Sequence, residues 1–204
     1  KIKAALFDLD GTLFDTQKLY DEANQKMIIA YGNKKELTQE AKNKICGTPA
    51  KFANKYLSDN YEIKLSNEEF QEKKHKFLEE TLKNSEYLPG AKEALNTMKN
   101  KYHLKIAIAT SSSKGPTDLK LFNYREFIDS IVDKIITGDD KRIEKGKPNP
   151  DIFLLAAKEL GVDPSECIIF EDAVLGVQAA LNTGAPIVVA IPIPSNKKEI
   201  ENIK

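Results

Sequence analysis

The chain has 204 residues, which is the size of one domain or of one domain with an insertion. Lysine plus arginine and aspartate plus glutamate each total 31, so the formal net charge is zero and nothing indicates a nucleic-acid partner. Hydrophobic residues make up 41%, no apolar run approaches the roughly 20 residues of a membrane span and no signal peptide is visible, so we expect a cytoplasmic protein that does not enter membranes.

The first part of the chain holds one predicted strand followed by a helical block. The apolar run of residues 4–9 predicts a buried strand that ends in aspartate. From about Gln17 to Ser85 the chain is rich in lysine and glutamate, and its apolar residues recur at helical spacing. The sequence Ser66 to Glu69 is typical of a capping box that opens a helix. Three segments are predicted to divide the block into separate helices: Gly32-Asn33, Gly47-Thr48-Pro49 and Ser58-Asp59-Asn60.

The rest of the chain alternates strands and helices. Strands are predicted over residues 104–110, 134–137, 167–172 and 186–191. Helices are predicted over residues 91–101, in part of 120–133, and over 150–160 and 173–183, the last two ended by Gly161 and Gly184. Continuous apolar strands alternating with helices indicate an α/β fold, a parallel sheet covered on both faces. The helical block interrupts this series, so we interpret residues 16–86 as an inserted domain and residues 1–15 and 87–204 as the core.

Polar side chains follow several of the predicted strands. In an open parallel sheet, ligands bind beyond the carboxyl ends of the strands. The residues at those ends are Asp8 and Asp10, Thr110 with Ser111 and Ser112, and Glu171 with Asp172. Lys147 precedes a proline turn ahead of the helix over residues 150–160. We expect these carboxylates, hydroxyls and this lysine to converge on one crevice.

Such a set of side chains supports phosphoryl transfer. Asp8 is the candidate nucleophile, which would attack phosphorus and form an aspartyl-phosphate. Asp10 is the candidate acid that protonates the leaving oxygen and the base that later takes a proton from water. Asp172, together with Asp8 and a backbone carbonyl, would hold Mg²⁺. Thr110 and Lys147 would bind the phosphate oxygens and neutralise their charge.

Each of these signals also has an ordinary structural explanation. The first aspartates could belong to a turn, the hydroxyl residues to a polar loop and Lys147 to the solvated surface. Glu171 and Asp172 could cap a helix and occupy its first turn. A calcium loop is excluded, because that loop needs its glycine at the sixth position, whereas Gly11 is the fourth residue from Asp8. The order of the signals and their places at strand ends favour the functional interpretation.

The same segments resemble the haloacid dehalogenase-like hydrolase superfamily over nearly the whole chain. The segment Asp8-Leu9-Asp10-Gly11-Thr12 is similar to its first motif, Thr110 to its second, Lys147 to its third and Glu171-Asp172 to its fourth. The resemblance implies a Rossmann-like core with an all-helical cap domain. It makes Asp8 the nucleophile and Asp10 the acid/base. The implied Mg²⁺ ligands are Asp8, the Asp10 carbonyl and Asp172, with Glu171 near the metal. The dehalogenases of the family lack an acid at the place of Asp10, which favours phosphate chemistry.

Longer segments, residues 137–160 and 170–181, resemble the pseudouridine-5′-phosphatase-like branch. The neighbouring β-phosphoglucomutase-like branch usually carries histidine where Tyr20 stands and arginine near residues 48–50. Neither is present here. We therefore expect hydrolysis of a small phosphomonoester, such as pseudouridine 5′-phosphate or a sugar phosphate. Tyr20, on the first helix of the inserted domain, and Lys51, after the loop of residues 46–51, are candidate substrate contacts, as are Thr110, Ser111, Ser112 and Lys147.

Two other functions stay open at this point. One is a sugar-phosphate mutase of the same fold, and the other is a non-enzymatic phospho-receiver or binding module. Receivers normally carry their acid pair first in the chain and have no inserted helical domain. The two cysteines, Cys46 and Cys167, are far apart and indicate reduced thiols rather than a disulfide. We expect a monomer whose partner is a small phosphate ester.

Overall fold

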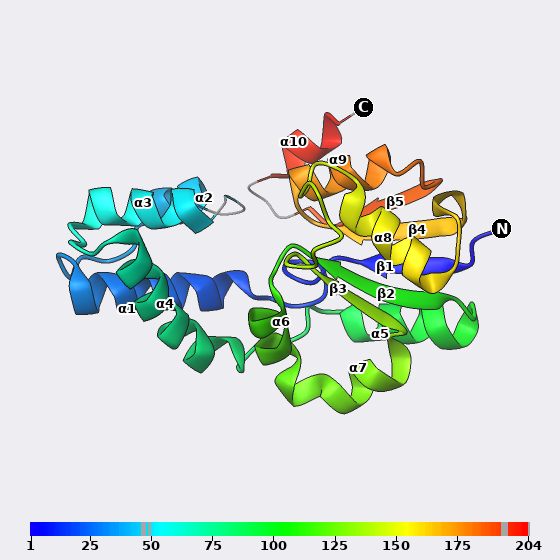
Figure 1. Cartoon of the computed structure of the whole chain (residues 1–204), viewed down its shortest axis with the longest axis horizontal. Helices are drawn as coiled ribbons and strands as arrows, with labels where there is room; N and C mark the ends of the chain where they lie inside the picture. Colours follow the sequence, from blue (N-terminus) through cyan, green and yellow to red (C-terminus); the bar gives the residue numbers. More distant parts are fainter. Residues whose placement is uncertain (46–47, 49, 193–195, 204) are drawn as a thin grey trace. The chain divides into compact units, whose positions relative to one another are not determined.

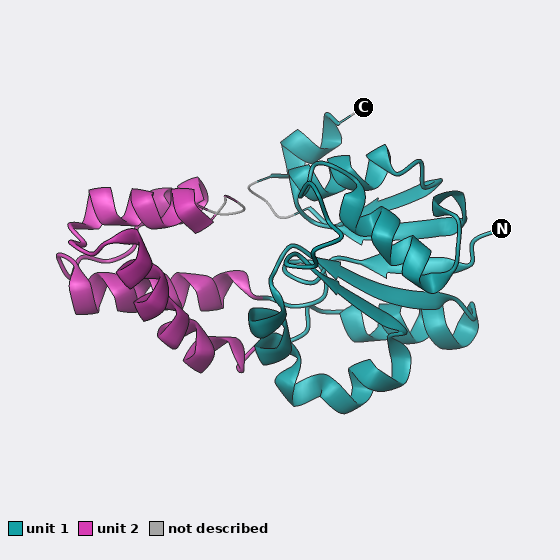
Figure 2. Cartoon of the chain, viewed as in Figure 1, with its two compact units in different colours: residues 1–15, 86–204 teal, residues 16–85 magenta. Residues whose placement is uncertain are grey.

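The structure, a computed structural model, describes residues 1–45, 48, 50–192 and 196–203. The described residues divide into two compact units, which Figure 2 shows in different colours. Unit 1 consists of residues 1–15 and 86–204, and unit 2 consists of residues 16–85. Each unit has an apolar core of its own, so each is described by itself.

The elements of unit 1 follow the alternation that the sequence predicts (Figure 1). Within the described residues its strands are β1 (Ala4–Phe7), β2 (Lys105–Thr110), β3 (Lys134–Thr137), β4 (Cys167–Glu171) and β5 (Ile187–Ala190). Its helices are α5 (Ala91–Asn96), α6 (Lys114–Leu121), α7 (Arg125–Ile131), α8 (Asp151–Leu160), α9 (Val174–Asn182) and α10 (Lys197–Glu201). A π-helical turn (Thr97–Lys101) continues α5, and short 3-10 turns lie at Phe122–Tyr124 and Pro164–Glu166.

The strands form one parallel sheet, in the order β3-β2-β1-β4-β5 within the described residues. Successive residues of the central strand β1 point to opposite faces, as the pleat requires. Ala4 and Leu6 join a core with residues of α8 and α9, whereas Ala5 and Phe7 join a core with residues of α5 and α7. Helices therefore cover both faces of the sheet, which confirms the predicted α/β class.

Chain direction in this sheet decides where its polar residues gather. Leu6 pairs with Ala107 of β2 on one side and with Ile169 of β4 on the other. The rings of Phe7 and Phe170 stack with centroids 4.3 Å apart, at the end of β1 and near the end of β4. Because all paired strands are parallel, the residues that follow β1, β2 and β4 lie along one edge of the sheet.

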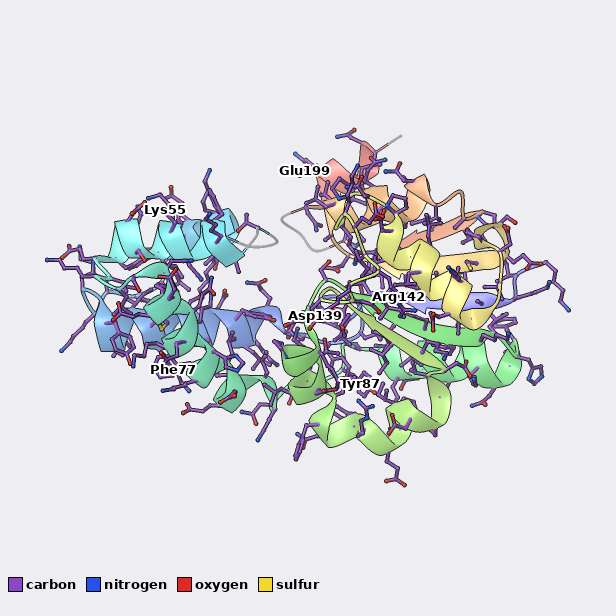
Figure 3. All side chains as sticks on the ribbon, in the orientation of Figure 1. Lys55, Phe77, Tyr87, Asp139, Arg142 and Glu199 are labelled. Atoms are coloured by element: carbon purple, nitrogen blue, oxygen red, sulfur yellow. The ribbon has the colours of Figure 1, made fainter. Side chains whose placement is uncertain are left out.

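The two points where the chain leaves and re-enters unit 1 lie side by side. The backbone N–H of Asp15 donates to the carbonyl of Glu86 at 2.9 Å. Next to this bond, the ring of Phe14 stacks on Tyr87, labelled in Figure 3, with ring centroids 4.3 Å apart. Inserting a long helical segment here therefore leaves the sheet of unit 1 continuous.

Unit 2 is a set of amphipathic helices: α1 (Gln17–Tyr31), α2 (Gln39–Ile45), α3 (Ala50–Tyr61) and α4 (Asn67–Leu82). Their apolar residues form a buried core that includes Met27, Leu57 and Phe70. Charged residues such as Lys55 are exposed (Figure 3). The lysine- and glutamate-rich composition of this block thus reflects the solvated faces of its helices.

Two predicted helix boundaries in unit 2 are confirmed. Gly32 follows the last residue of α1 and its N–H donates to the carbonyl of Ile28 at 3.0 Å. The capping box forms before α4, where the Glu69 N–H donates to Ser66 Oγ at 3.2 Å and the Ser66 N–H donates to Glu69 Oε2 at 2.8 Å. The predicted break at residues 47–49 lies largely outside the described residues, of which only Thr48 belongs to it.

The other predictions for helix boundaries need correction. The break at residues 58–60 is wrong, because α3 continues through them to Tyr61. Ala53, Leu57 and Tyr61 are buried at intervals of four residues, so packing holds the helix together through polar residues of low helix propensity. The helix expected within residues 120–133 is in fact two, and the first of them, α6, already begins at Lys114.

In the part of the chain that the structure describes, no helix has the length and apolar character needed to cross a membrane. Cys167 is a buried free thiol at the start of β4, and Cys46 lies outside the described residues. The cytoplasmic location and the monomeric state stay predictions.

Candidate active site

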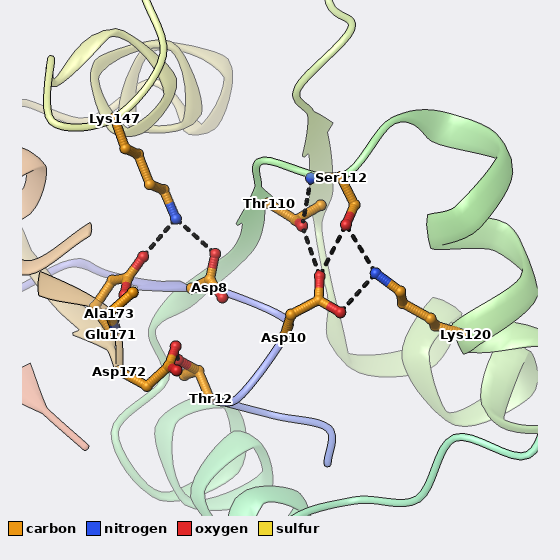
Figure 4. Close-up of polar contacts among 10 residues, drawn as sticks. All are labelled: Asp8, Asp10, Thr12, Thr110, Ser112, Lys120, Lys147, Glu171, Asp172 and Ala173. Atoms are coloured by element: carbon orange, nitrogen blue, oxygen red, sulfur yellow. Dashed lines mark hydrogen bonds and ion pairs between the residues drawn. The ribbon is translucent and has the colours of Figure 1, made fainter. Parts of the chain in front are cut away.

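The polar residues that follow β1, β2 and β4 form two adjoining clusters at one edge of the sheet (Figure 4). Asp8 directly follows β1, and its N–H continues the ladder by donating to the Phe170 carbonyl at 3.0 Å. Thr110 is the last residue of β2, and Glu171 is the last residue of β4. The loop before α8 contributes Lys147. Asp8 and Glu171, 163 positions apart in the chain, are thus brought together by the pairing of β1 with β4, and the loop before α8 adds Lys147.

The first cluster is centred on the ammonium group of Lys147. Its Nζ lies 2.6 Å from Asp8 Oδ1 and 2.5 Å from Glu171 Oε1. The other oxygen of Glu171, Oε2, accepts the N–H of Ala173 at 2.8 Å. Asp8 and Glu171 are 6% and 1% exposed, so this ion pair network is almost fully removed from water. Such a network holds Lys147 against the candidate nucleophile.

Asp172 lies beside this cluster, against the loop that follows β1. Thr12 Oγ1 donates to Asp172 Oδ1 at 3.1 Å, and Asn196 Nδ2 donates to the Asp172 carbonyl at 2.8 Å. Gly11 has a φ of +84°, and a Cβ on it would lie 2.2 Å from Asp172 Oδ2. Glycine is therefore required here for two reasons: it adopts the positive φ of the turn, and it has no Cβ to collide with the Asp172 carboxylate.

The second cluster is built around Asp10. Ser112 Oγ donates to Asp10 Oδ2 at 2.9 Å, and Thr110 Oγ1 donates to the same oxygen at a longer 3.4 Å. The hydroxyl of Thr110 also accepts the Ser112 N–H at 3.1 Å. Lys120 of α6 lies 2.5 Å from Asp10 Oδ1 and donates to Ser112 Oγ at 2.7 Å. The two catalytic candidates thus have separate partners, Lys147 for Asp8 and Lys120 for Asp10.

Burial and neighbouring charge shift the pKa values of the acidic residues here. Burial raises the pKa of the Asp8 carboxyl well above its usual range, with Lys147 opposing the rise and Glu171 and Asp172 adding to it. Burial also raises the pKa of Asp172 to about 7, and the charge of Glu171 adds to the shift. Burial by itself would lower the pKa of Lys147, but the carboxylates of Asp8 and Glu171 raise it overall.

These shifts indicate how a cation would fit the first cluster. Three carboxyl groups, those of Asp8, Glu171 and Asp172, share this edge with the one ammonium group of Lys147. When all three carboxyl groups are ionised, two negative charges exceed the charge of Lys147; a divalent cation would balance them, and hard carboxylate oxygens are the donors that Mg²⁺ prefers. Among the described residues no three histidine, cysteine or acidic side chains are grouped to hold a metal by themselves. Mg²⁺ sites commonly use one or two carboxylates plus water and phosphate oxygens, which agrees with a ligand set of two carboxylates and a carbonyl.

Not every residue predicted for the site is joined to these clusters. Ser111 is exposed, and no hydrogen bond among those found in the described residues links its side chain to an acidic residue. Tyr20 on α1 and Lys51 on α3 belong to unit 2, so their role in binding substrate stays a prediction. The loop expected to contact substrate, residues 46–51, lies partly outside the described residues.

The sequence interpretation missed two residues of the site. In the sequence Thr12 stands out only as the last residue of the first motif, yet its hydroxyl donates to Asp172 and positions it. The sequence places Lys120 only at the start of a segment that is predicted to be helical in part, yet its side chain is fully buried beside Asp10. A signal for Lys120 was available, because Thr117, Lys120 and Leu121 fall at helical spacing and share the buried face of α6. A lysine in that register is the kind of buried charge that needs a partner.

Comparisons with known proteins agree with this geometry. The family model described as haloacid dehalogenase-like hydrolase matches residues 5–190. A Drosophila melanogaster protein named probable pseudouridine-5′-phosphatase is 34% identical over 201 residues, which cover 98% of this chain and 85% of that protein. A Thermotoga maritima protein named phosphorylated carbohydrates phosphatase is 35% identical over 187 residues, 90% of this chain and 82% of that one.

A solved structure extends the similarity to the fold. The crystal structure of an Entamoeba histolytica protein, described as a HAD hydrolase of family IA, variant 3, superposes with a TM-score of 0.81 at 29% identity. The match covers all of this chain and 90% of the other. The shared fold therefore includes the residues of both units.

Proposed function

Because this chain belongs to the haloacid dehalogenase-like hydrolase family, we propose that it hydrolyses a small phosphomonoester with Mg²⁺ through an aspartyl-phosphate on Asp8. That the enzyme is a phosphatase follows from the family and from relatives that are named phosphatases. The observation that carries the finer proposal is the separation of the two aspartates. Asp8 is paired with Lys147, and Asp10 is held by hydroxyls and a second lysine.

The two carboxylates differ in what they can do. In the first step a carboxylate oxygen of Asp8 attacks phosphorus, and the bond from phosphorus to the substrate oxygen breaks. Asp10 gives its proton to the departing oxygen, so that an alcohol leaves rather than an alkoxide. In the second step Asp10 takes a proton from water, the water oxygen attacks phosphorus, and Asp8 is released with inorganic phosphate. Each step returns Asp10 to the protonation state that the other step needs.

The remaining residues bind phosphate and control charge. Lys147 touches Asp8 and is positioned to neutralise a phosphate oxygen near the nucleophile. Both oxygens of Glu171 already accept hydrogen bonds, so we assign Glu171 the role of holding Lys147 rather than that of a direct metal ligand. The hydroxyl of Thr110 can reach a phosphate oxygen by rotating away from Asp10, to which its hydrogen bond is long.

Mg²⁺ would be held by the carboxylates of Asp8 and Asp172 and by the backbone carbonyl of Asp10. When bound, the ion supplies positive charge that offsets the repulsion between the substrate phosphate and Asp8. Gly11 and Thr12 set the distance between the loop after β1 and Asp172. The fold itself therefore places the Asp172 carboxylate beside that loop.

The proposed substrate class rests on the names of the relatives. We propose that residues 16–85 form the cap that covers the substrate, with Tyr20 and Lys51 as candidate contacts. The relatives named for pseudouridine 5′-phosphate and for phosphorylated carbohydrates support a nucleotide-like or sugar monophosphate. Both are phosphate esters of an alcohol on a small polar ring or chain.

A phosphate-release screen tests the proposal. The purified protein with Mg²⁺ is assayed against pseudouridine 5′-phosphate, sugar phosphates, glycerol phosphate and flavin mononucleotide. We expect release of inorganic phosphate from at least one of them, and loss of that activity in Asp8→Asn with an unchanged circular dichroism spectrum. Turnover by Asp8→Asn at the wild-type rate would refute the mechanism. Conversion of one sugar phosphate into another without phosphate release would indicate a mutase instead.

A further inference from the structure

Lys120 is a charged residue in a place where charged residues are rare. It lies in the last turn of α6, and its side chain is 0% exposed. Among the described residues it is the only lysine that is buried as a whole residue. Burying an ammonium group is costly unless a partner compensates its charge. The partner of Lys120 therefore explains why a lysine stands there.

That partner is the carboxylate of Asp10. Lys120 Nζ lies 2.5 Å from Asp10 Oδ1 and donates to Ser112 Oγ at 2.7 Å, while Ser112 Oγ donates to Asp10 Oδ2 at 2.9 Å. The three side chains form a closed ring of contacts that engages both oxygens of Asp10 (Figure 4). We propose that Lys120 is a positioning residue, which through this ring holds the Asp10 carboxyl in the orientation that donates a proton to the leaving oxygen.

The inference rests on the proposed function, in which Asp10 is the acid and base. It differs from the role of Lys147, because Lys147 contacts Asp8 and Glu171 and belongs to the other cluster. The Asp10 side chain is 27% exposed, so packing alone does not fix it. Without Lys120 the Oδ1 atom loses its close cation and the ring opens, so the carboxyl is held less firmly, although the hydroxyls of Ser112 and Thr110 still donate to Oδ2. A small displacement of a catalytic group can cost up to about a hundredfold in rate.

This role predicts a dependence on the leaving group that a structural role does not. An alkyl phosphate releases a strongly basic alkoxide, which needs the proton from Asp10 as the bond breaks. p-Nitrophenyl phosphate releases a weakly basic phenolate, which leaves with little help. A misplaced acid therefore slows the first substrate much more than the second. A general loss of folded or well-packed enzyme slows both substrates by the same factor.

The test compares Lys120→Met with the wild type on glycerol phosphate and on p-nitrophenyl phosphate. The quantity compared is kcat/KM, which reports the steps up to departure of the alcohol. We expect kcat/KM for glycerol phosphate to fall roughly ten- to a hundredfold more than that for p-nitrophenyl phosphate, a part of the usual contribution of an acid catalyst. A second variant, Ser112→Ala, opens the same ring. It should also lose more kcat/KM on glycerol phosphate than on p-nitrophenyl phosphate, by a smaller factor, and it keeps the test available if Lys120→Met does not fold.

Leu121→Val is the matched control, since Leu121 is the buried apolar neighbour on the same helix and belongs to the core cluster beneath it. It should leave the ratio of the two kcat/KM values unchanged. Equal losses on both substrates in Lys120→Met and Ser112→Ala would overturn the inference while leaving the proposed phosphatase function in place. A wild-type protein that hydrolyses neither substrate nor any ester of the screen would overturn the proposed function and this inference with it.

Discussion

Gly176 in α9 offers a sharp test of how tightly the first cluster is built. The residue is an ordinary helical glycine, whose φ is not positive, yet a Cβ on it would lie 1.8 Å from Glu171 Oε1 and 2.0 Å from the Glu171 carboxyl carbon. Real Cβ atoms do not approach so closely. In Gly176→Ala the Glu171 side chain must therefore leave its position, although alanine is the better helix former.

The loss of stability in Gly176→Ala can be estimated from the hydrogen bonds that Glu171 would lose. It accepts hydrogen bonds from the Ala173 N–H and from Lys147, and it is 1% exposed. Hydrogen bonds to a charged group contribute about 1.5–3 kcal/mol each, so losing both costs about 3–6 kcal/mol. The gain in helix propensity returns about 1 kcal/mol. We therefore expect Gly176→Ala to lower the free energy of unfolding by about 2–5 kcal/mol and to reduce kcat, because Lys147 loses one of its two anchors.

Urea unfolding followed by circular dichroism, together with the phosphate-release assay, measures both effects. Gly115→Ala is the matched control, since Gly115 lies in α6 and a Cβ on it would meet no atom within 4 Å. That variant should be as stable as the wild type or up to about 1 kcal/mol more stable. If Gly176→Ala were also as stable as the wild type and fully active, Glu171 would not be held where we describe it, and the reasoning would be refuted.

Three further predictions concern the catalytic groups. Asp10→Asn should lower kcat roughly 10²- to 10⁴-fold, and a near-normal rate would show that Asp10 is not the acid and base. Removing Mg²⁺ with EDTA should stop turnover, adding Mg²⁺ back should restore it, and unchanged turnover in EDTA would contradict the metal assignment. The pKa of Asp172 is raised from 3.8 to about 7, so the metal-free folded state holds a proton that the unfolded state has lost, and stability should fall as pH rises between about 4 and 7. Urea titrations at several pH values should show that this group lowers the free energy of unfolding by at most about 1.4 kcal/mol per pH unit. If Asp172→Asn left this pH dependence unchanged, the raised pKa of Asp172 would be contradicted.

Much of the site could be predicted because strand ends are visible in a sequence. The apolar runs before Asp8, before Thr110 and before Glu171 predicted parallel strands, and parallel strands place their carboxyl ends at one edge. The structure brings Asp8, Lys147 and Glu171 into direct contact at that edge. For Asp8 and Glu171 the prediction needed no knowledge of side-chain packing, since parallel strands place their carboxyl ends at one edge, whereas Lys147 comes from the loop before α8.

Helix boundaries and helix faces were harder to predict. The segment at residues 58–60 has the composition of a loop, yet buried Leu57 and Tyr61 on either side keep α3 intact. The sequence does not reveal that α6 begins at Lys114, and so it does not reveal the helical register that buries Lys120. In both cases tertiary contacts override local composition, which is a weak determinant of short helices.

By itself the sequence determined the alternation of strands and helices, and it predicted an inserted helical block and acidic residues at the strand ends, because these depend on local patterns and on chain direction. Only the tertiary structure decided which lysine pairs with which carboxylate. The sequence singles out Lys147 and not Lys120, and only the folded chain shows that Lys147 contacts Asp8 and Glu171 whereas Lys120 contacts Asp10. Those pairings depend on the packing of α6 and of the loop before α8, and on distances that only the folded chain defines.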